Sequence, residues 1–376
     1  MRKIISAFLS LCILTSVCAA DLEATNVESG VFTLEEAIEY AIKNNSYLID
    51  MEKNTDTQEE LYDDAKTEYR KWKNQTKNGG YSFEESIEYL NCWGYSLELA
   101  KLQYESFLSN KNAAKFQVEY SVKSMIYNIF ELEDSISLLE KTIEKQENDV
   151  KIAEVKYRLN MITETELDSA KTTLDSSKLQ LESIKQSLAS VKISIKQLMG
   201  YDVLKEISFE KPEYEVEELE IEDLESTINS SLETNVSALS SKIQYKQKEN
   251  NYILATKTSF FSKDEKKDAK KDYSDAEFRL NNEINSIKEN MVILYNQVKE
   301  KEKETDIAKE ELDSADSQFE QAKTMYEVGL ISKNTYDGYE LSFINAENTY
   351  KSKIKEEILL KNRWEIAISV GDIIAK

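Results

Sequence analysis

The chain has 376 residues and a formal net charge of −23, from 71 acidic and 48 basic side chains. Such an excess of negative charge repels phosphate backbones and anionic lipid headgroups, so we expect no nucleic-acid partner. The chain contains no histidine, and its carboxylates are spread along it, so we predict no catalytic residues, no metal site and no cofactor. One proline and eight glycines permit long unbroken helices, which predicts an all-α fold with few or no β-strands.

Residues 1–20 have the pattern of a secretory signal peptide. Two basic residues precede an apolar run over residues 4–17, and small residues follow it. An apolar run of about 14 residues is shorter than the ~20 that a membrane anchor needs. A lipoprotein site at Cys18 fits less well, because the residues before it lack the usual leucine. We therefore expect cleavage after Ala20 and export to the cell envelope: to the outer membrane or periplasm if the cell has them, otherwise to the cell surface.

The first expected helix covers residues 34–53. Thr33 is a favourable N-cap, and Glu36 completes a capping box with it. A faint copy of this segment begins at Leu224, which lies 190 positions after Leu34. The copy is the first sign that the chain contains the same unit twice.

Two long apolar patterns repeat each other at an offset of 169 positions and predict two coiled-coil helical hairpins. Apolar residues recur in alternating steps of three and four, which is typical of helices that supercoil about their neighbours. We predict a first hairpin repeat over residues 21–201, an acidic linker over 202–223 and a second hairpin repeat over 224–376. In the first repeat the pattern consists of Ile129, Leu132, Ile136, Leu139, Ile143, Val150, Ala153 and Tyr157, followed by Leu167, Ala170, Leu174, Ser177, Leu181, Ile184, Leu188, Val191, Ile195 and Leu198.

Each repeat contains the same short turn between its two helices. The turns read YRLNMIT at residues 157–163 and YEVGLIS at 326–332. Asn160 and Gly329 stand where a helix ends in the left-handed conformation, which asparagine tolerates and glycine enters freely. Thr163 and Ser332 then stand where an N-cap starts the next helix, and Glu166 completes a capping box with Thr163.

The turn geometry does not require the apolar pair that both turns share. The pair is Met161–Ile162 in the first turn and Leu330–Ile331 in the second. These side chains either close the end of the core, as the apolar contact of a helix C-cap does, or form an apolar knob that docks a partner. The two interpretations are compatible.

Asp168 and Asp337 also match at the 169-residue offset, one place past an apolar position. In an assembled tube they would form a ring of negative charge facing the lumen. The plainer interpretation is that they lie on a solvated face of an acidic helix.

Together these features resemble the TolC-like outer membrane efflux proteins. The resemblance rests on the opening LEEAIEYAIKNNSYL at residues 34–48, the paired turns, the helix-long repeats and the export signal. It implies a homotrimer whose protomers form an α-helical tube, with the hairpin tips docking a periplasmic adaptor (membrane fusion) protein that works with an inner-membrane transporter. Carried over by position, the adaptor-docking tip residues are Asn160, Met161, Ile162, Thr163, Gly329, Leu330, Ile331 and Ser332.

At the end opposite the tips, channel members of the family insert a pair of β-strands into each half. The corresponding breaks, around residues 72–94 and 259–268, lack ~10-residue strands with an apolar lipid face, so we expect these strands to be missing. The aromatic residues of the 72–94 segment suit either a membrane interface or a packed far end of the helices. A membrane contact at this end is thus one of two interpretations.

Two functions follow as expectations. The first is an exported channel or conduit subunit of an efflux or type I secretion system. The alternative is a structural or adhesive coiled-coil protein of the cell surface or periplasm, with no transport role. The two tip motifs favour the conduit, and the missing strands favour the structural protein.

Overall fold

The computed structural model describes residues 31–77, 94–214, 216–257 and 261–374. Over these ranges the all-α prediction is confirmed, and the elements are β1 (Val31–Phe32), α1 (Leu34–Asn44), α2 (Ser46–Lys77), α4 (Tyr95–Arg158), α5 (Glu164–Met199), β2 (Ser208–Phe209), α6 (Leu224–Ser231), α7 (Val236–Lys257), α8 (Lys263–Glu327) and α9 (Lys333–Val370). The two short strands pair in parallel, with Val31 opposite Ser208 and Phe32 opposite Phe209. The predicted signal peptide and most of the 72–94 break lie outside the described residues.

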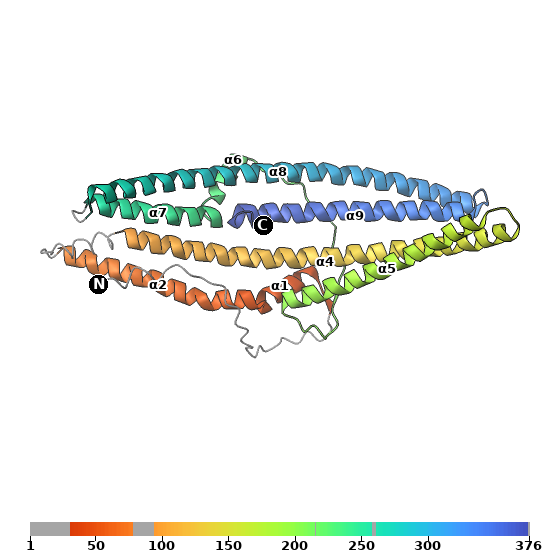
Figure 1. The fold of residues 1–376 in the computed structure, drawn as a ribbon, viewed down its shortest axis with the longest axis horizontal. Coiled ribbons are helices and arrows are strands. Elements are labelled where there is room, and N and C mark those ends of the chain that lie inside the picture. Colours follow the sequence, from red (N-terminus) through yellow and green to blue (C-terminus); the bar gives the residue numbers. More distant parts are fainter. Residues whose placement is uncertain (1–30, 78–93, 215, 258–260, 375–376) are drawn as a thin grey trace. The chain divides into compact units, whose positions relative to one another are not determined.

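Two long helices, α4 and α8, organise the helical layer (Figure 1). α5 packs along the half of α4 that leads to the first tip, and α2 packs along its other half. α9 and α7 pack along α8 in the same way, and α4 also contacts both of them. The contacts therefore run in the order α5, α4, α9, α8 near the tips and α2, α4, α7, α8 at the opposite end. This order places α8 on one edge of the layer and α2 with α5 on the other.

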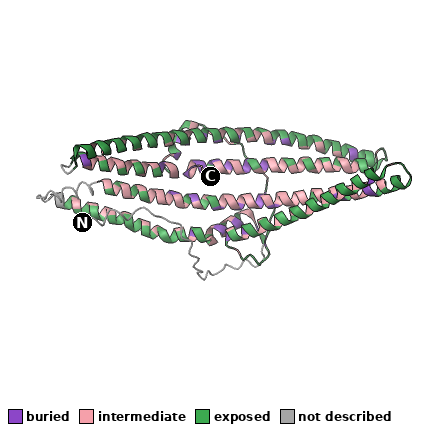
Figure 2. Cartoon of the chain, viewed as in Figure 1, coloured by how far each residue is buried: buried purple, intermediate pink, exposed green. Residues whose placement is uncertain are grey.

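The predicted coiled-coil register is confirmed in the first hairpin. Every predicted apolar position of α5 from Leu167 to Leu198 is buried or half-buried, whereas most positions between them are exposed. In α4 the predicted positions are also covered, except Tyr157 at the tip. Figure 2 shows the same pattern, with the covered residues following the inner sides of the helices.

A ladder of ion pairs fixes the antiparallel register of α4 against α5. Lysines at every seventh position of α5 pair with glutamates at every seventh position of α4, as the flanking positions of a coiled coil do. The N–O distances are 3.4 Å for Lys171–Glu154, 2.9 Å for Lys178–Glu147, 2.9 Å for Lys185–Glu140 and 3.1 Å for Lys192–Glu133. One pair of the second hairpin, Lys361–Glu302 at 2.8 Å, lies 169 positions after the last of these.

The single helix expected over residues 34–53 is wrong, because the chain breaks at Asn45. The backbone there is extended, and the Asn45 side-chain oxygen accepts hydrogen bonds from the N–H groups of Tyr47 and Leu48. Its amide nitrogen donates to the carbonyl of Leu198 at 2.9 Å. Asparagine competes with the helical backbone in this way, and the distant acceptor holds it at the break. The predicted capping box of Thr33 with Glu36 is confirmed.

The same break recurs in the second half. α6 is capped by Asp223 and ends before Asn235, whose side chain accepts a hydrogen bond from Ala238 N–H at 3.0 Å. Thr33 and Asn45 thus have counterparts 190 positions later, at the offset that the sequence comparison predicts. Each half builds its own core around this junction: one centres on Ile126, Ile195 and Met199, the other on Met291, Leu294, Val298 and Trp364.

The segment between α5 and α6 crosses the helices as a strap and is held by contacts with three of them. The Tyr127 hydroxyl on α4 donates to the carbonyl of Glu213 at 3.2 Å. Lys361 on α9 donates to the carbonyl of Glu217, and Leu219 N–H donates to Glu302 on α8 at 2.8 Å. The strap therefore ties the two hairpins together.

Candidate functional site

The two tips have the same backbone geometry. Asn160 has φ 54°, and it is the one non-glycine residue with positive φ in the described part of the chain; Gly329 has φ 76°. The following residues, Met161 and Leu330, each donate a backbone hydrogen bond of 2.8 Å to the carbonyl five positions earlier. This is the Schellman pattern, which satisfies carbonyls that the end of a helix leaves open. The predicted left-handed positions are confirmed.

Both following helices begin at the predicted N-caps, but the two caps differ. Thr163 forms a full capping box: its hydroxyl accepts from Glu166 N–H at 3.3 Å, and the Glu166 carboxylate accepts from Thr163 N–H at 2.7 Å. The Thr163 N–H and the Thr163 hydroxyl both donate to the Glu166 carboxylate and lower its pKa. Ser332 accepts a hydrogen bond from Thr335 N–H at 3.2 Å. Thr335 has no carboxylate that could accept a hydrogen bond from Ser332 N–H, so the capping box is incomplete. The first tip, which lacks the glycine, thus has the stronger cap.

The two residues of each apolar pair differ in exposure, and each fits a different interpretation. Met161 and Leu330 are 67% and 70% exposed, which is unusual for large apolar side chains. Ile162 and Ile331 are half-buried. The first member of each pair therefore points to solvent, while the second covers the end of the coiled coil.

Each tip has a second exposed apolar residue that the sequence patterns did not predict. Leu159 and Val328 stand immediately before the left-handed residues and are 64% and 65% exposed. They also correspond at the 169-residue offset, which is the signal that identifies them. Each tip therefore presents two large apolar side chains, and we call Leu159, Met161, Val328 and Leu330 the apolar tip set.

Aromatic packing distinguishes the second hairpin behind its tip. The rings of Tyr326 and Tyr336 stack with centroids 5.0 Å apart, and those of Phe319 and Phe343 stack at 5.4 Å. At the corresponding places the first hairpin has Tyr157 and aliphatic residues. The second tip thus rests on a flat aromatic stack, which is worth about 0.5–1.5 kcal/mol per pair beyond its buried area.

The two aspartates of the predicted lumen ring lie on different hairpins. Asp168 is on α5 and exposed, and Asp337 is on α9 and half-buried. Neither forms an ion pair with another residue in the described ranges. The ring requires several copies of the chain and stays a prediction.

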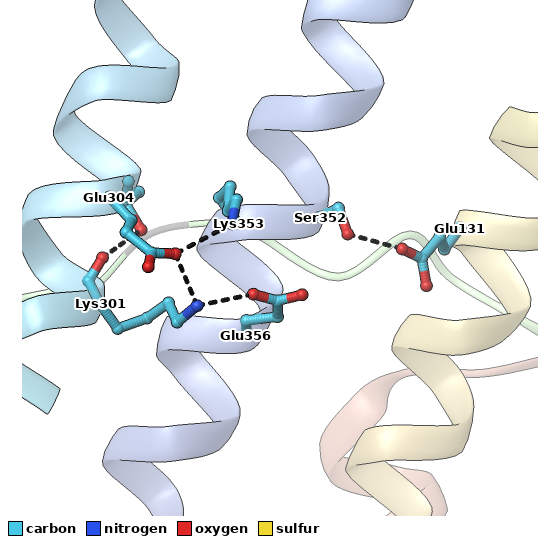
Figure 3. Close-up of polar contacts among 7 residues, drawn as sticks. Glu131, Lys301, Glu304, Ser352, Lys353 and Glu356 are labelled. Carbon is cyan, nitrogen blue, oxygen red and sulfur yellow. Dashed lines mark hydrogen bonds and ion pairs between the residues drawn. The ribbon is translucent and has the colours of Figure 1, made fainter. Parts of the chain in front are cut away.

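A belt of polar contacts joins α8, α9 and α4 midway along the layer (Figure 3). Lys301 and Lys353 contact the carboxylate of Glu304 at 2.7 and 2.9 Å, and Lys301 also contacts Glu356 at 2.9 Å. Hydrogen bonds from the two lysines lower the pKa of Glu304 to about 2. These groups neutralise one another and leave no unpaired carboxylate that would serve as an acid or base.

The belt continues onto α4 through Glu131. Ser352 donates to its carboxylate at 2.7 Å, and Lys355 forms an ion pair with it. Burial raises the pKa of Glu131, but the hydrogen bonds from Lys355 and Ser352 outweigh it, so the pKa lies below its usual value. Among the described residues, no group of three side chains is placed to hold a metal ion. No helix within the described ranges is both long enough and apolar enough to span a membrane.

Comparison with known proteins bears on this architecture. No family model and no curated protein sequence matches the chain. Among solved structures, 90% of the chain aligns with the CmeC outer membrane channel of Campylobacter jejuni (14% identity, 86% of that chain, TM-score 0.62). The same share aligns with the MtrE outer membrane channel of Neisseria gonorrhoeae (13% identity, 89% of that chain, TM-score 0.63). It also aligns with the outer membrane protein VceC of Vibrio cholerae (10% identity, 96% of that chain, TM-score 0.60).

Identities this low carry the fold and not the function of these proteins. The likeness nevertheless covers nine-tenths of the chain. The chain therefore has the helical fold of the TolC-like outer membrane channels, as the resemblance in its sequence predicted.

Proposed function

We propose that the protein is an exported conduit subunit of an efflux or type I secretion system in the cell envelope. Copies of the chain assemble into an α-helical tube, for which a homotrimer is expected, and the tips dock a periplasmic adaptor that works with an inner-membrane transporter. The observation that carries the proposal is the apolar tip set. Four large apolar side chains are exposed at the ends of two hairpins, on a fold shared with outer membrane channels.

The open edges of the layer support assembly. α8 stands on one edge and α5 on the other, and both bear exposed apolar side chains away from their partner helices. Leu179 and Ile193 on α5 are 74% and 49% exposed, and Ile307 on α8 is 58% exposed. A contact between two different edges repeats head to tail and closes into a ring when the rotation permits. A ring of such layers forms a tube.

The proposed mechanism is passive. The transporter supplies the energy, and this subunit supplies a tube whose tips move by small shifts between hairpins. The chain itself carries out no chemical reaction in this scheme.

The mass of the mature protein in solution tests the assembly. Residues 21–376 are purified and measured by light scattering with and without mild detergent. About three times the protomer mass supports the tube. A monomer in both conditions contradicts it and favours the alternative, a structural or adhesive coiled-coil protein.

The docking role of the tips has its own test. A photoreactive residue is introduced at position 330 or 161 in the native cell, and the crosslinked products are identified by mass spectrometry. Position 204 is the control, because Leu204 lies in the strap and is 91% exposed. We expect a crosslink to an adaptor at the tip positions only. The double variant Leu330→Asp, Met161→Asp should abolish export that depends on docking of the tips. Identical products at all three positions would refute tip docking.

A further inference from the structure

A polar cavity lies where the strap crosses between the two hairpins. Its walls are formed by α4, by α9 and by Tyr214 of the strap, and its volume is about 290 Å³. It lies beside the belt of Figure 3, because Glu131 and Ser352 belong to both. This volume is close to the lower limit of small-molecule sites, which is about 300 Å³. The cavity therefore has room for one small ligand.

Every charged side chain that lines the cavity already has an ion-pair partner. Asp134 pairs with Lys351 at 3.3 Å, and Glu131 pairs with Lys355. The remaining charged residue, Lys353, is paired within the belt described above. A charged ligand would have to break one of these pairs or stay without a counter-ion, and both outcomes are costly. The walls therefore favour a neutral ligand.

The neutral polar groups of the cavity, in contrast, are available for hydrogen bonds. The hydroxyls of Tyr214 and Ser135 and the side-chain amide of Asn345 form no hydrogen bond with any described residue. Asn348 donates from its amide nitrogen to the carbonyl of Asp134 at 3.3 Å, which leaves its side-chain oxygen free to accept. Burial, and then the charge of Asp134, raise the pKa of Tyr214, so its hydroxyl stays protonated and can donate as well as accept. An apolar ligand would displace water from these groups and leave them unpaired, which is unfavourable.

Tyr214 is held in place by contacts with α4. Its ring meets the ring of Tyr127 edge-on, with centroids 5.5 Å apart. The Tyr127 hydroxyl also holds the strap at the residue before Tyr214. On its other side Tyr214 lines a second cavity, of about 520 Å³, together with Tyr350 and Ile354. The two cavities share Tyr214 as a wall, which gives room for a ligand of more than one ring.

The polar groups of the cavity are not part of the repeated coiled-coil pattern. At the 169-residue offset, Asn348 and Lys351 correspond to Leu179 and Glu182 on α5. Leu179 is 74% exposed, so the first hairpin has an apolar surface residue where the second has an amide of the cavity. The first hairpin thus forms its coiled coil without these groups, which indicates that the helical scaffold does not require them.

We propose that the cavity is a binding site for a neutral sugar, as one unit of a short oligosaccharide. Sugar hydroxyls both donate and accept hydrogen bonds, as the hydroxyl and amide groups of the cavity do. The apolar face of a sugar ring packs against an aromatic ring such as that of Tyr214. A neutral ring also leaves the ion pairs of the walls intact. This inference is independent of the proposed conduit, because a single chain carries the whole site.

Saturation-transfer NMR of the mature protein, residues 21–376, tests the proposal. The neutral probes are maltotetraose, cellotetraose and the N-acetylglucosamine tetramer. The charged probes are tetragalacturonate, which is an anion, and the glucosamine tetramer, which is a cation. We expect at least one neutral probe to bind with a Kd of about 1 mM or below, and the charged probes to bind at least about tenfold more weakly. No binding of any neutral probe at about 10 mM, or a charged probe that binds within about tenfold of the best neutral one, would overturn the proposal.

Two conservative substitutions with a matched control locate the site. The variant Tyr214→Phe, Asn345→Ala removes two hydrogen-bonding groups but keeps the ring and the ion pairs. It should lower the affinity for the bound probe at least about tenfold, since each neutral hydrogen bond contributes several-fold. The control Tyr339→Phe, Asn282→Ala makes the same two changes at exposed positions that do not line the cavity. We expect the control to bind within about twofold of the unmodified protein. Equal affinities of the two variants would refute the assignment to this cavity. Circular dichroism of both proteins verifies that they are folded.

Discussion

Two glycines in the left-handed conformation provide a comparison that separates backbone strain from steric clash. Gly329 at the second tip has φ 76°, and Gly200 at the end of α5 has φ 69°. A Cβ added at Gly329 would meet no atom of the described residues within 4 Å. At Gly200 it would lie 2.5 Å from the backbone carbonyl oxygen of Asn44. Alanine at the two positions therefore incurs the same conformational cost but a different packing cost.

The expected loss of unfolding free energy follows from the backbone conformation and the packing at each glycine. Left-handed backbone costs an alanine about 1–2 kcal/mol, and alanine regains about 0.4–1 kcal/mol by restricting the unfolded chain. We expect Gly329→Ala to lower the free energy of unfolding by about 0–1.6 kcal/mol on this basis. Gly200→Ala adds a clash with backbone, for which overpacking typically costs about 1–3 kcal/mol. The difference between the two variants should be that last quantity, because the backbone contributions cancel.

Urea unfolding followed by far-UV circular dichroism measures both variants against the unmodified protein. Gly200→Ala should unfold at the lower urea concentration, with the slope of the transition unchanged. Equal midpoints for the two variants would refute the reasoning, because they would mean that the end of α1 does not pack against the end of α5. A larger loss in Gly329→Ala would refute it as well.

Further predictions concern the ion pairs. Lys361→Met should lower the free energy of unfolding by about 3–5 kcal/mol, because it leaves the buried carboxylate of Glu357 without its cation, whereas Glu302 keeps its ion pair with Lys299; a loss below about 1 kcal/mol in urea unfolding would contradict the pairing. The exposed pair Lys185–Glu140 should show a coupling of only about 0.2–1 kcal/mol in a double-mutant cycle, and it should fade at about 1 M salt. Glu304, whose pKa falls from 4.5 to about 2 on folding, stabilises the fold above pH 4.5, and this contribution is lost as the pH falls toward 2. The stability difference between Glu304→Gln and the unmodified protein should therefore shrink over that range; a constant difference would count against the assignment.

The sequence by itself determined the features that are encoded within a few residues of one another. The register of α5, the left-handed residues Asn160 and Gly329, and the capping box of Thr163 all depend on helix periodicity or on contacts within about one helical turn. The 169-residue offset extended the left-handed residue and the N-cap position from one hairpin to the other, although Ser332 has no capping box. The same offset relates Leu159 to Val328, the exposed apolar residues that precede the left-handed positions.

Only the tertiary structure decided the features that depend on distant partners. The helix breaks at Asn45 because Leu198, 153 positions away, accepts its side-chain hydrogen bond. Met161 is 67% exposed while its neighbour Ile162 is half-buried, a difference that the turn motif does not specify. Such outcomes depend on which elements become neighbours, and local periodicity carries no record of that choice.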